Sequence, residues 1–168
     1  MKVFLIGMPG CGKTTLGKIA AKKLGMEFAD MDKEIEKAEG RSISDIFKLY
    51  GEEYFRDAET KALREEARGG ENKIVSTGGG IVVKEENMEI LQNSGAEVIF
   101  IDRPPECIEA DIECSKRPLM KNGADAVYKL YRQRYVRYRR ACTAKIINNS
   151  DFGNAVSVLI RVIRSRCL

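Results

Sequence analysis

Residues 7–14 read Gly7-Met8-Pro9-Gly10-Cys11-Gly12-Lys13-Thr14, which fits the pattern G-x-x-x-x-G-K-[ST] of a phosphate-binding loop. The flanking sequence supplies the context that this motif requires. An apolar run at 2–6 predicts a buried strand before the loop, and apolar residues at helical spacing follow it as far as Gly25, which can end a helix. The stretch therefore predicts a strand, a phosphate-binding loop and a helix, rather than an ordinary glycine-rich turn.

Phosphate binding in such a loop depends mostly on the backbone. Glycines let the chain curl so that several N–H groups point at phosphate oxygens, and the N-terminus of the following helix favours anions. Lys13 is placed to reach the β- and γ-phosphates of a nucleotide, and the Thr14 hydroxyl to hold Mg²⁺. The residues expected to bind ATP here are Gly10, Cys11, Gly12, Lys13, Thr14 and Thr15.

Length and composition bound the class of protein. A chain of 168 residues with 43% hydrophobic and 32% charged residues predicts one soluble domain, residues 1–168. No apolar run approaches the ~20 residues of a membrane span, and the first strand begins too early for a signal peptide. The five cysteines form no C-x-x-C pair, which indicates reduced thiols in a cytoplasm rather than disulfides or a zinc site.

Histidine is absent from the sequence. Its absence excludes Ser–His and Cys–His nucleophilic mechanisms and any histidine-ligated metal. Proton transfer must then depend on carboxylates, lysine or tyrosine. The net charge of +4 suits an anionic substrate and does not require nucleic acid as a partner.

Strand and helix patterns alternate along the whole chain. Alternation of this kind predicts an α/β fold, with a five-stranded parallel sheet between two layers of helices. In such a sheet, ligands bind beyond the carboxyl ends of the strands, so the residues that follow each strand are the candidates for a site. The expected strands are 2–6, 27–30, 73–76, 97–102 and 144–148.

Two carboxylates, Asp30 and Asp32, follow the second expected strand. Near a phosphate-binding loop, one can hold Mg²⁺ through water and the other can accept a proton from an attacking hydroxyl. The alternative is a helix cap, because Asp is favoured where helices begin. The proximity of the loop favours the functional interpretation.

Arg56 and Glu59 are three residues apart and share one face of an expected helix. They can be an exposed ion pair of little consequence. Alternatively, Arg56 binds a substrate carboxylate through two N–H groups and Glu59 braces it. The spacing alone leaves both interpretations open.

Three consecutive glycines, Gly78, Gly79 and Gly80, follow the third expected strand. They allow a ligand to approach the backbone closely, although they can also form only a tight turn. After the fourth strand, a polar stretch that includes Lys116 and Arg117 predicts a lid at about 111–124 that closes over phosphates, or else a solvated loop.

The segment 125–144 alternates basic residues with tyrosines, a composition that also occurs in RNA-binding helices. Arg134, however, shares a helical face with apolar residues and Tyr138, so we expect it to point toward the site, with the remaining basic residues solvated. An amphipathic helix at the C-terminal end completes the helical layers.

Together, several of these stretches resemble the shikimate kinase family, over nearly the whole chain and in the same order and spacing. The phosphate-binding loop alone is shared by a large superfamily, whereas the Phe-Arg…Glu and triple-glycine motifs are far more specific. The resemblance rests on the loop at 7–14, Asp30-Met31-Asp32, Gly40-Arg41-Ser42-Ile43, Ile46-Phe47, Gly51-Glu52, Phe55-Arg56-Asp57-Ala58-Glu59, Gly78-Gly79-Gly80 and Arg117-Pro118-Leu119.

The resemblance implies a P-loop kinase fold of the nucleoside-monophosphate-kinase type and ATP- and Mg²⁺-dependent phosphorylation of the 3-hydroxyl of shikimate, a step of aromatic amino acid biosynthesis. It implies a cytoplasmic enzyme, expected to be a monomer that binds neither nucleic acid nor a membrane. By position, the resemblance implies Asp32 as the base that binds the 3-hydroxyl, Asp30 at Mg²⁺ through water, Arg56 and Arg134 on the substrate carboxylate, the backbone of Gly78, Gly79 and Gly80 beside the substrate, and Arg117 as the lid arginine near the transferred phosphate.

The sequence departs from the family pattern at two places. Ala110 stands where relatives often place an arginine against adenine, and the Arg-x-Pro-Leu-Tyr pattern near Arg134 reads Arg134-Tyr135-Val136-Arg137-Tyr138. Two alternatives to a shikimate kinase remain. One is another small-molecule kinase, such as a gluconate or nucleotide kinase. The other is a nucleotide-dependent switch or RNA-binding module, although a guanine-reading Asn-Lys-x-Asp is lacking because Val75 takes the place of the aspartate.

Overall fold

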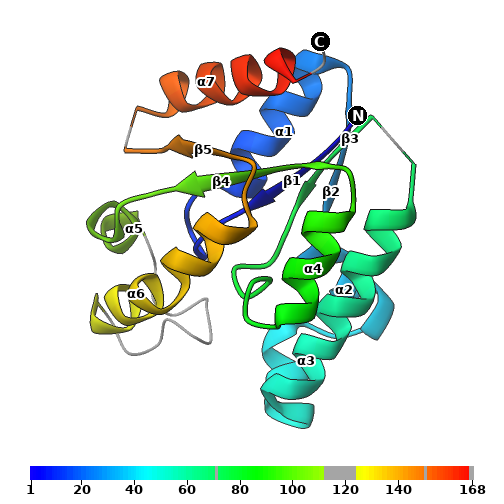
Figure 1. Cartoon of the computed structure of the whole chain (residues 1–168). Helices are drawn as coiled ribbons and strands as arrows, with labels where there is room; N and C mark the ends of the chain where they lie inside the picture. Colours follow the sequence, from blue (N-terminus) through cyan, green and yellow to red (C-terminus); the bar gives the residue numbers. More distant parts are fainter. Residues whose placement is uncertain (71, 112–123, 150, 167–168) are drawn as a thin grey trace.

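The computed structural model describes residues 1–70, 72–111, 124–149 and 151–166. Within them, five strands form one parallel sheet in the order β2-β3-β1-β4-β5 (Figure 1). The elements are β1 (Lys2–Ile6), α1 (Lys13–Leu24), β2 (Glu27–Asp30), α2 (Met31–Glu39), α3 (Ile43–Arg68), β3 (Lys73–Ser76), α4 (Glu85–Asn93), β4 (Glu97–Asp102), α5 (Pro105–Asp111), α6 (Ala124–Ala141), β5 (Ala144–Ile147) and α7 (Phe152–Ser165).

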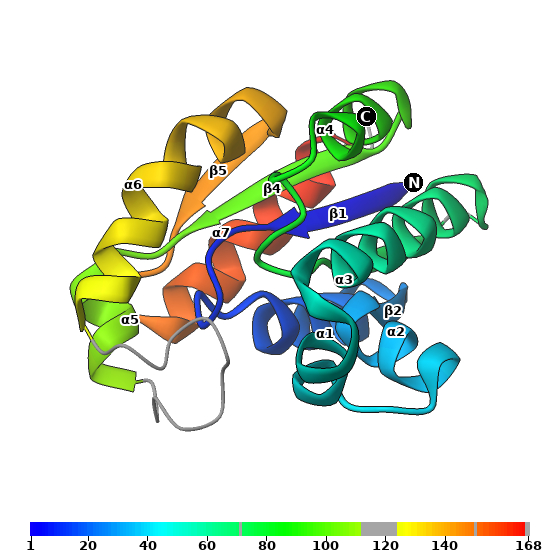
Figure 2. The ribbon, with the colours of Figure 1, turned by 90° about the horizontal axis from the view of Figure 1, so that it is seen from below.

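Helices cover both faces of the sheet. α1 and α7 pack against each other on one face, while α3, α4 and α6 follow one another across the other face (Figures 1 and 2). This arrangement confirms the predicted three-layer α/β/α architecture. The five expected strands are confirmed as well, except that β5 ends at Ile147, one residue before the expected end at 148. The residue beyond it, Asn148, instead contacts the phosphate-binding loop.

The core lies on both sides of the central strands. Every residue of β1 is buried, as a parallel strand covered by helices requires. Each fully buried Leu, Ile or Phe side chain contributes about 1.5–3 kcal/mol, and β1 with β4 supplies a continuous run of them. α7 presents Val156, Leu159 and Ile163 to this core and exposes its basic residues. The phosphate-binding loop is thereby anchored to a fully buried strand at the centre of the sheet.

Local signals explain where the helices begin and end. Gly25 ends α1 with φ 66°, a left-handed conformation that glycine adopts without strain. Ser42 begins α3, because its side chain accepts a hydrogen bond from the Asp45 N–H at 3.1 Å. α3 is interrupted at Gly51, where φ is 82° and ψ 177°, so the segment that carries Arg56 begins anew after this residue. No helix in the described part of the chain is long and apolar enough to cross a bilayer.

Candidate active site

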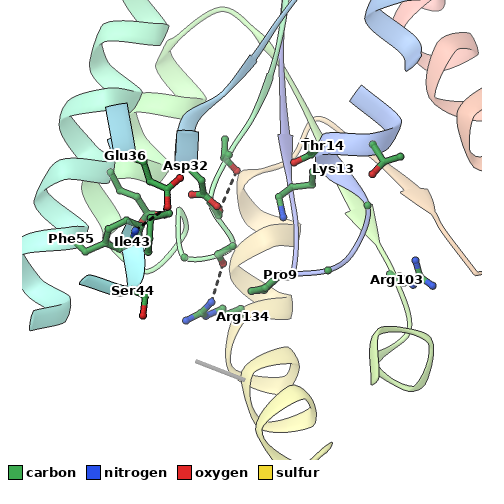
Figure 3. Close-up of a pocket in the computed structure, with 18 of the residues that line it drawn as sticks. Pro9, Lys13, Thr14, Asp32, Glu36, Ile43, Ser44, Phe55, Arg103 and Arg134 are labelled. Carbon is green, nitrogen blue, oxygen red and sulfur yellow. Dashed lines mark hydrogen bonds between the residues drawn. The ribbon is translucent and has the colours of Figure 1, made fainter. Parts of the chain in front are cut away.

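A cavity of about 810 Å³ opens at the carboxyl edge of the sheet, where the sequence predicts a site (Figure 3). The loop that follows β1 forms its centre, with Lys13 and Thr14 between Asp32 on one side and Arg103 on the other. The predicted site residues that line the cavity are Gly10, Gly12, Lys13, Thr14, Thr15, Asp32, Arg56, Gly78, Gly79, Gly80 and Arg134. Residues from five separate parts of the chain are therefore brought together.

The phosphate-binding loop has the curled backbone that the motif predicts. Gly7, Gly10 and Gly12 have φ values of 145°, 81° and 97°, which residues with a Cβ rarely adopt. Lys13 is 7% exposed. Its ammonium group donates hydrogen bonds to the carbonyls of Gly7 and Met8, each at 2.9 Å. Lys13 is thus held within the curl of the loop, at the start of α1.

Cys11 contributes to the loop through its backbone. Its thiol is buried, and its carbonyl accepts a hydrogen bond from Asn148 Nδ2 at 2.9 Å. A Cβ at Gly12 would lie 2.8 Å from the same Asn148 nitrogen, so glycine is required at this position for space as well as for φ. From the sequence, Asn148 was expected only as the end of a strand, and its contact with the loop was not predicted.

A cluster of three oxygens lies beside the loop. Thr14 Oγ1 donates to Asp30 Oδ2 at 2.7 Å and is 3.2 Å from Ser76 Oγ. Asp30 and Ser76 are neighbours in register at the ends of β2 and β3, which explains why they meet here. Asp30 stands at the N-cap position of α2, but its side chain makes no capping hydrogen bond to the helix and accepts from Thr14 instead. The oxygen set fits a hard cation such as Mg²⁺.

Ser76 was not predicted as a site residue, although it stands in the sequence directly before the triple-glycine stretch. Asp32 lines the cavity from the first turn of α2. The helix dipole also favours a carboxylate at this position. Both carboxylates after β2 are therefore near the loop, as expected.

The three glycines after β3 are required for space. Their φ values lie outside the left-handed region, unlike those of the loop glycines. A Cβ at Gly78 would lie 2.8 Å from Asp32 Oδ1, one at Gly79 would lie 2.5 Å from Pro9 Cδ, and one at Gly80 would overlap the Arg56 guanidinium. The glycines therefore let the protein's own side chains pack against the backbone, while ligand contact at these positions stays a prediction.

Arg56 and Glu59 form a buried ion pair, so the interpretation as an exposed pair is wrong. Arg56 is 4% exposed, Glu59 is 0% exposed, and Nη1 of the arginine is 2.5 Å from Glu59 Oε2. Glu52 Oε1 adds contacts to Nη2 at 3.0 Å and to Nε at 3.2 Å. The guanidinium thus has a carboxylate on each of two sides.

Burial and charge shift the pKa values of this pair. Burial lowers the pKa of Arg56, but Glu59 and then Glu52 outweigh it, so that the pKa lies above its ordinary value. Burial raises the pKa of Glu59, and the charge of Arg56 opposes this only in part. Breaking such a pair by removing one partner is costly, because it leaves a charge buried without compensation.

Arg134 points into the cavity from α6, as predicted. It is 6% exposed, and its Nη1 donates to the Gly79 carbonyl at 3.0 Å (dashed in Figure 3). The Tyr138 hydroxyl, one turn along, donates to the same carbonyl at 2.5 Å. Burial raises the pKa of Tyr138, which keeps this hydroxyl protonated as a donor. The departure from the family pattern after Arg134 therefore does not remove Arg134 from the site.

The other basic residues of α6 are not all solvated, contrary to expectation. Arg137 donates to the carbonyls of Val82 and Val83, both at 3.1 Å. Arg140 pairs with Glu85 in α4 at 2.9 Å. These contacts attach α6 to α4 and to the loop after β3, which gives the arginines of this segment a structural role.

The far end of the cavity contains residues that were not predicted as site residues from the sequence. Arg103, directly after β4, pairs with Asp111, and both line the cavity together with Phe152. Ala110 beside them is exposed. Arg117 and most of the lid expected at about 111–124 fall on residues 112–123, which lie outside the described part of the chain.

Comparisons with known proteins agree with this geometry. A family model described as Shikimate kinase matches residues 9–164. The chain is 46% identical to the shikimate kinase of Clostridium botulinum (strain Eklund 17B / Type B) over 162 residues, 96% of each protein. It is also 46% identical to that of Clostridium beijerinckii over 163 residues, 96% of this chain and 94% of the relative.

Solved structures give the same result. Shikimate kinase from Acinetobacter baumannii in complex with shikimate is 32% identical with a TM-score of 0.92, covering 99% of this chain and 94% of that one. Shikimate kinase from Aquifex aeolicus is 32% identical with a TM-score of 0.85, covering 100% and 99%. These matches favour shikimate kinase over gluconate kinase, nucleotide kinase and RNA-binding alternatives. The chain belongs to the shikimate kinase family.

Proposed function

We infer that this protein is a shikimate kinase, which uses ATP to phosphorylate the 3-hydroxyl of shikimate in aromatic amino acid biosynthesis. Family membership over nearly the whole chain supports this activity. The structural observation that carries it is one cavity in which a phosphate-binding loop, a carboxylate and two buried arginines meet. The loop suits a nucleotide, and the arginines suit a small anionic acceptor.

The loop side of the cavity would bind the phosphates of ATP. Amide groups of the loop and Lys13 would neutralise phosphate charge, and Thr15 would add a hydroxyl beside them. The Thr14 hydroxyl would hold Mg²⁺, with Asp30 contributing through water. When bound, Mg²⁺ supplies further positive charge to the phosphates. From the resemblance, Arg117 would do the same near the transferred phosphate.

The opposite side would bind the acceptor. Arg56 and Arg134 would contact the carboxylate of shikimate, with the backbone of Gly78, Gly79 and Gly80 beside the ring. Asp32 would accept the proton of the 3-hydroxyl as it attacks the γ-phosphate. Phosphoryl transfer of this kind depends on positioning and charge stabilisation more than on covalent chemistry, and the cavity offers both.

We also propose a monomeric, single-domain enzyme of the cytoplasm that acts without nucleic acid. The internal contacts of Arg134, Arg137 and Arg140 support the last point, because they use basic groups of the segment that resembles an RNA-binding helix.

A coupled assay that measures ADP release tests the proposed activity. We expect turnover with ATP, Mg²⁺ and shikimate, no turnover when Mg²⁺ is chelated, and none with gluconate or a nucleoside monophosphate in place of shikimate. Retention on RNA at physiological salt without turnover of shikimate would contradict the proposal.

A further inference from the structure

Arg56 is shared between two carboxylates of the same helix. A guanidinium has five N–H donors, and Glu52 and Glu59 accept from three of them: Nε at 3.2 Å, Nη2 at 3.0 Å and Nη1 at 2.5 Å. Any anion that binds to Arg56 therefore meets a positive charge that already faces two negative ones. The two carboxylates thus bear directly on the affinity of the site for an anionic substrate.

The two carboxylates differ in how firmly they are held. The Glu59 side chain is 0% exposed, so its carboxylate has no solvent contact that could replace Arg56. The Glu52 side chain is 52% exposed. Because half of the Glu52 side chain is in water, its i,i+4 pair with Arg56 is more strongly screened than the buried pair with Glu59, and water can replace Arg56 as its partner. Glu52 is therefore the carboxylate that a ligand can replace as a partner of Arg56, whereas Glu59 stays paired with it.

The backbone places Glu52 where its side chain is free to turn toward water. Gly51 interrupts α3 with φ 82° and ψ 177°, and Glu52 follows it directly. Arg56 and Glu59 lie one and two turns further along the same helical segment, where they are buried. Glu52 thus stands at the exposed beginning of this segment, whereas the buried pair lies further along it.

We propose that Glu52 sets the affinity of the enzyme for the carboxylate of its substrate, by competing with that carboxylate for Arg56. This inference rests on the proposed role of Arg56 in shikimate binding. Removing the charge at position 52 leaves Arg56 paired with Glu59 alone and so more positive toward an anion. Glutamine keeps an oxygen that can accept from Arg56, so the arginine also keeps its orientation.

Glu52→Gln tests the proposal, with Glu53→Gln as the matched control. Glu53 is exposed and adjacent, and its replacement removes the same charge. We expect Glu52→Gln to lower KM for shikimate, and Kd for shikimate without nucleotide, roughly two- to fivefold, the range that an exposed pair is worth. We expect kcat and KM for ATP to stay within about 1.5-fold, and Glu53→Gln to leave all four constants within the same limit.

An unchanged or raised KM for shikimate in Glu52→Gln overturns the proposal, and a raised value would make Glu52 a brace for Arg56 instead. Arg56→Lys separates this failure from failure of the site. If Arg56→Lys raises KM for shikimate and Glu52→Gln changes nothing, only the role of Glu52 is wrong. If Arg56→Lys leaves KM for shikimate unchanged, the role of Arg56 is wrong and that of Glu52 with it.

Discussion

The two ends of the cavity are built in different ways. The phosphate end is one contiguous loop, in which three glycines with positive φ shape the backbone and Lys13 is held by carbonyls five and six residues away. The acceptor end is assembled from α2, α3, the loop after β3 and α6, with side chains buried against glycines that lack positive φ. A local motif therefore specifies the first end, whereas tertiary packing specifies the second.

Removal of the positive charge of Lys13 at the phosphate end should have the largest effect on activity. Lys13→Ala removes the ammonium within the loop while leaving the backbone amides in place, so we expect kcat/KM to fall roughly 10²–10³-fold, as for removal of a single charge-stabilising donor. Lys22→Ala, on the exposed last turn of the same helix, is the control and should be near wild type. Activity of Lys13→Ala within threefold of wild type in the coupled assay would refute the loop assignment.

The next effect concerns Asp32, which lies where the two ends meet. Asp32→Asn keeps the size of the side chain but removes its ability to take a proton, so we expect kcat to fall about 10²-fold with KM for ATP largely unchanged. Glu34→Gln, exposed on the same helix, should retain full activity. A fall in kcat of less than tenfold, equivalent to ~1.4 kcal/mol of barrier, would show that Asp32 is not the base.

A smaller effect should show that a glycine after β3 is required for space. A Cβ at Gly80 overlaps the Arg56 guanidinium, so Gly80→Ala should displace the arginine, raise KM for shikimate several-fold and lower stability by about 1–3 kcal/mol. KM for ATP should be unaffected. Gly70→Ala is the control, because a Cβ there meets nothing within 4 Å. Urea unfolding measures the change in stability, and steady-state kinetics measures KM for shikimate. Equal shikimate KM values in Gly80→Ala and Gly70→Ala would contradict the packing of Gly80 against Arg56.

The same contrast explains what the sequence could predict. The alternation of apolar runs with helical patterns located every strand, and the phosphate-binding loop was recognised from adjacent residues alone. Arg56 and Glu59 were predicted as a pair, but their burial was not, because it depends on Gly78 and Gly80, which lie in a later, separate stretch of the chain. Spacing within one helix contains no information about what packs against it.

The residues that were missed have the same explanation. Asn148 supports the loop through a hydrogen bond to Cys11, 137 residues earlier in the chain. Ser76 lies beside Asp30 because β2 and β3 pair in register, and both side chains contact Thr14. The Gly79 carbonyl accepts hydrogen bonds from Arg134 and Tyr138 of α6. Each contact follows from the order of strands in the sheet, which a single sequence does not specify residue by residue.

Arg56 is proposed to bind the carboxylate of the substrate, and a double cycle with a neutral analogue is the sharpest test of this contact. Arg56→Lys keeps the charge but loses the planar pair of N–H groups that matches a carboxylate. We measure KM for shikimate and for its carboxamide with wild type and with this variant. Arg56→Lys should raise KM for shikimate about tenfold or more and leave KM for ATP within twofold.

The carboxamide should be a poor substrate of the wild type and should barely distinguish the two enzymes, because the group that Arg56 binds has been removed. The two changes should therefore be non-additive, with a coupling energy of about 0.5–3 kcal/mol. If the effects of mutation and analogue simply add, Arg56 does not contact the carboxylate, and its buried pair with Glu59 only stabilises the fold.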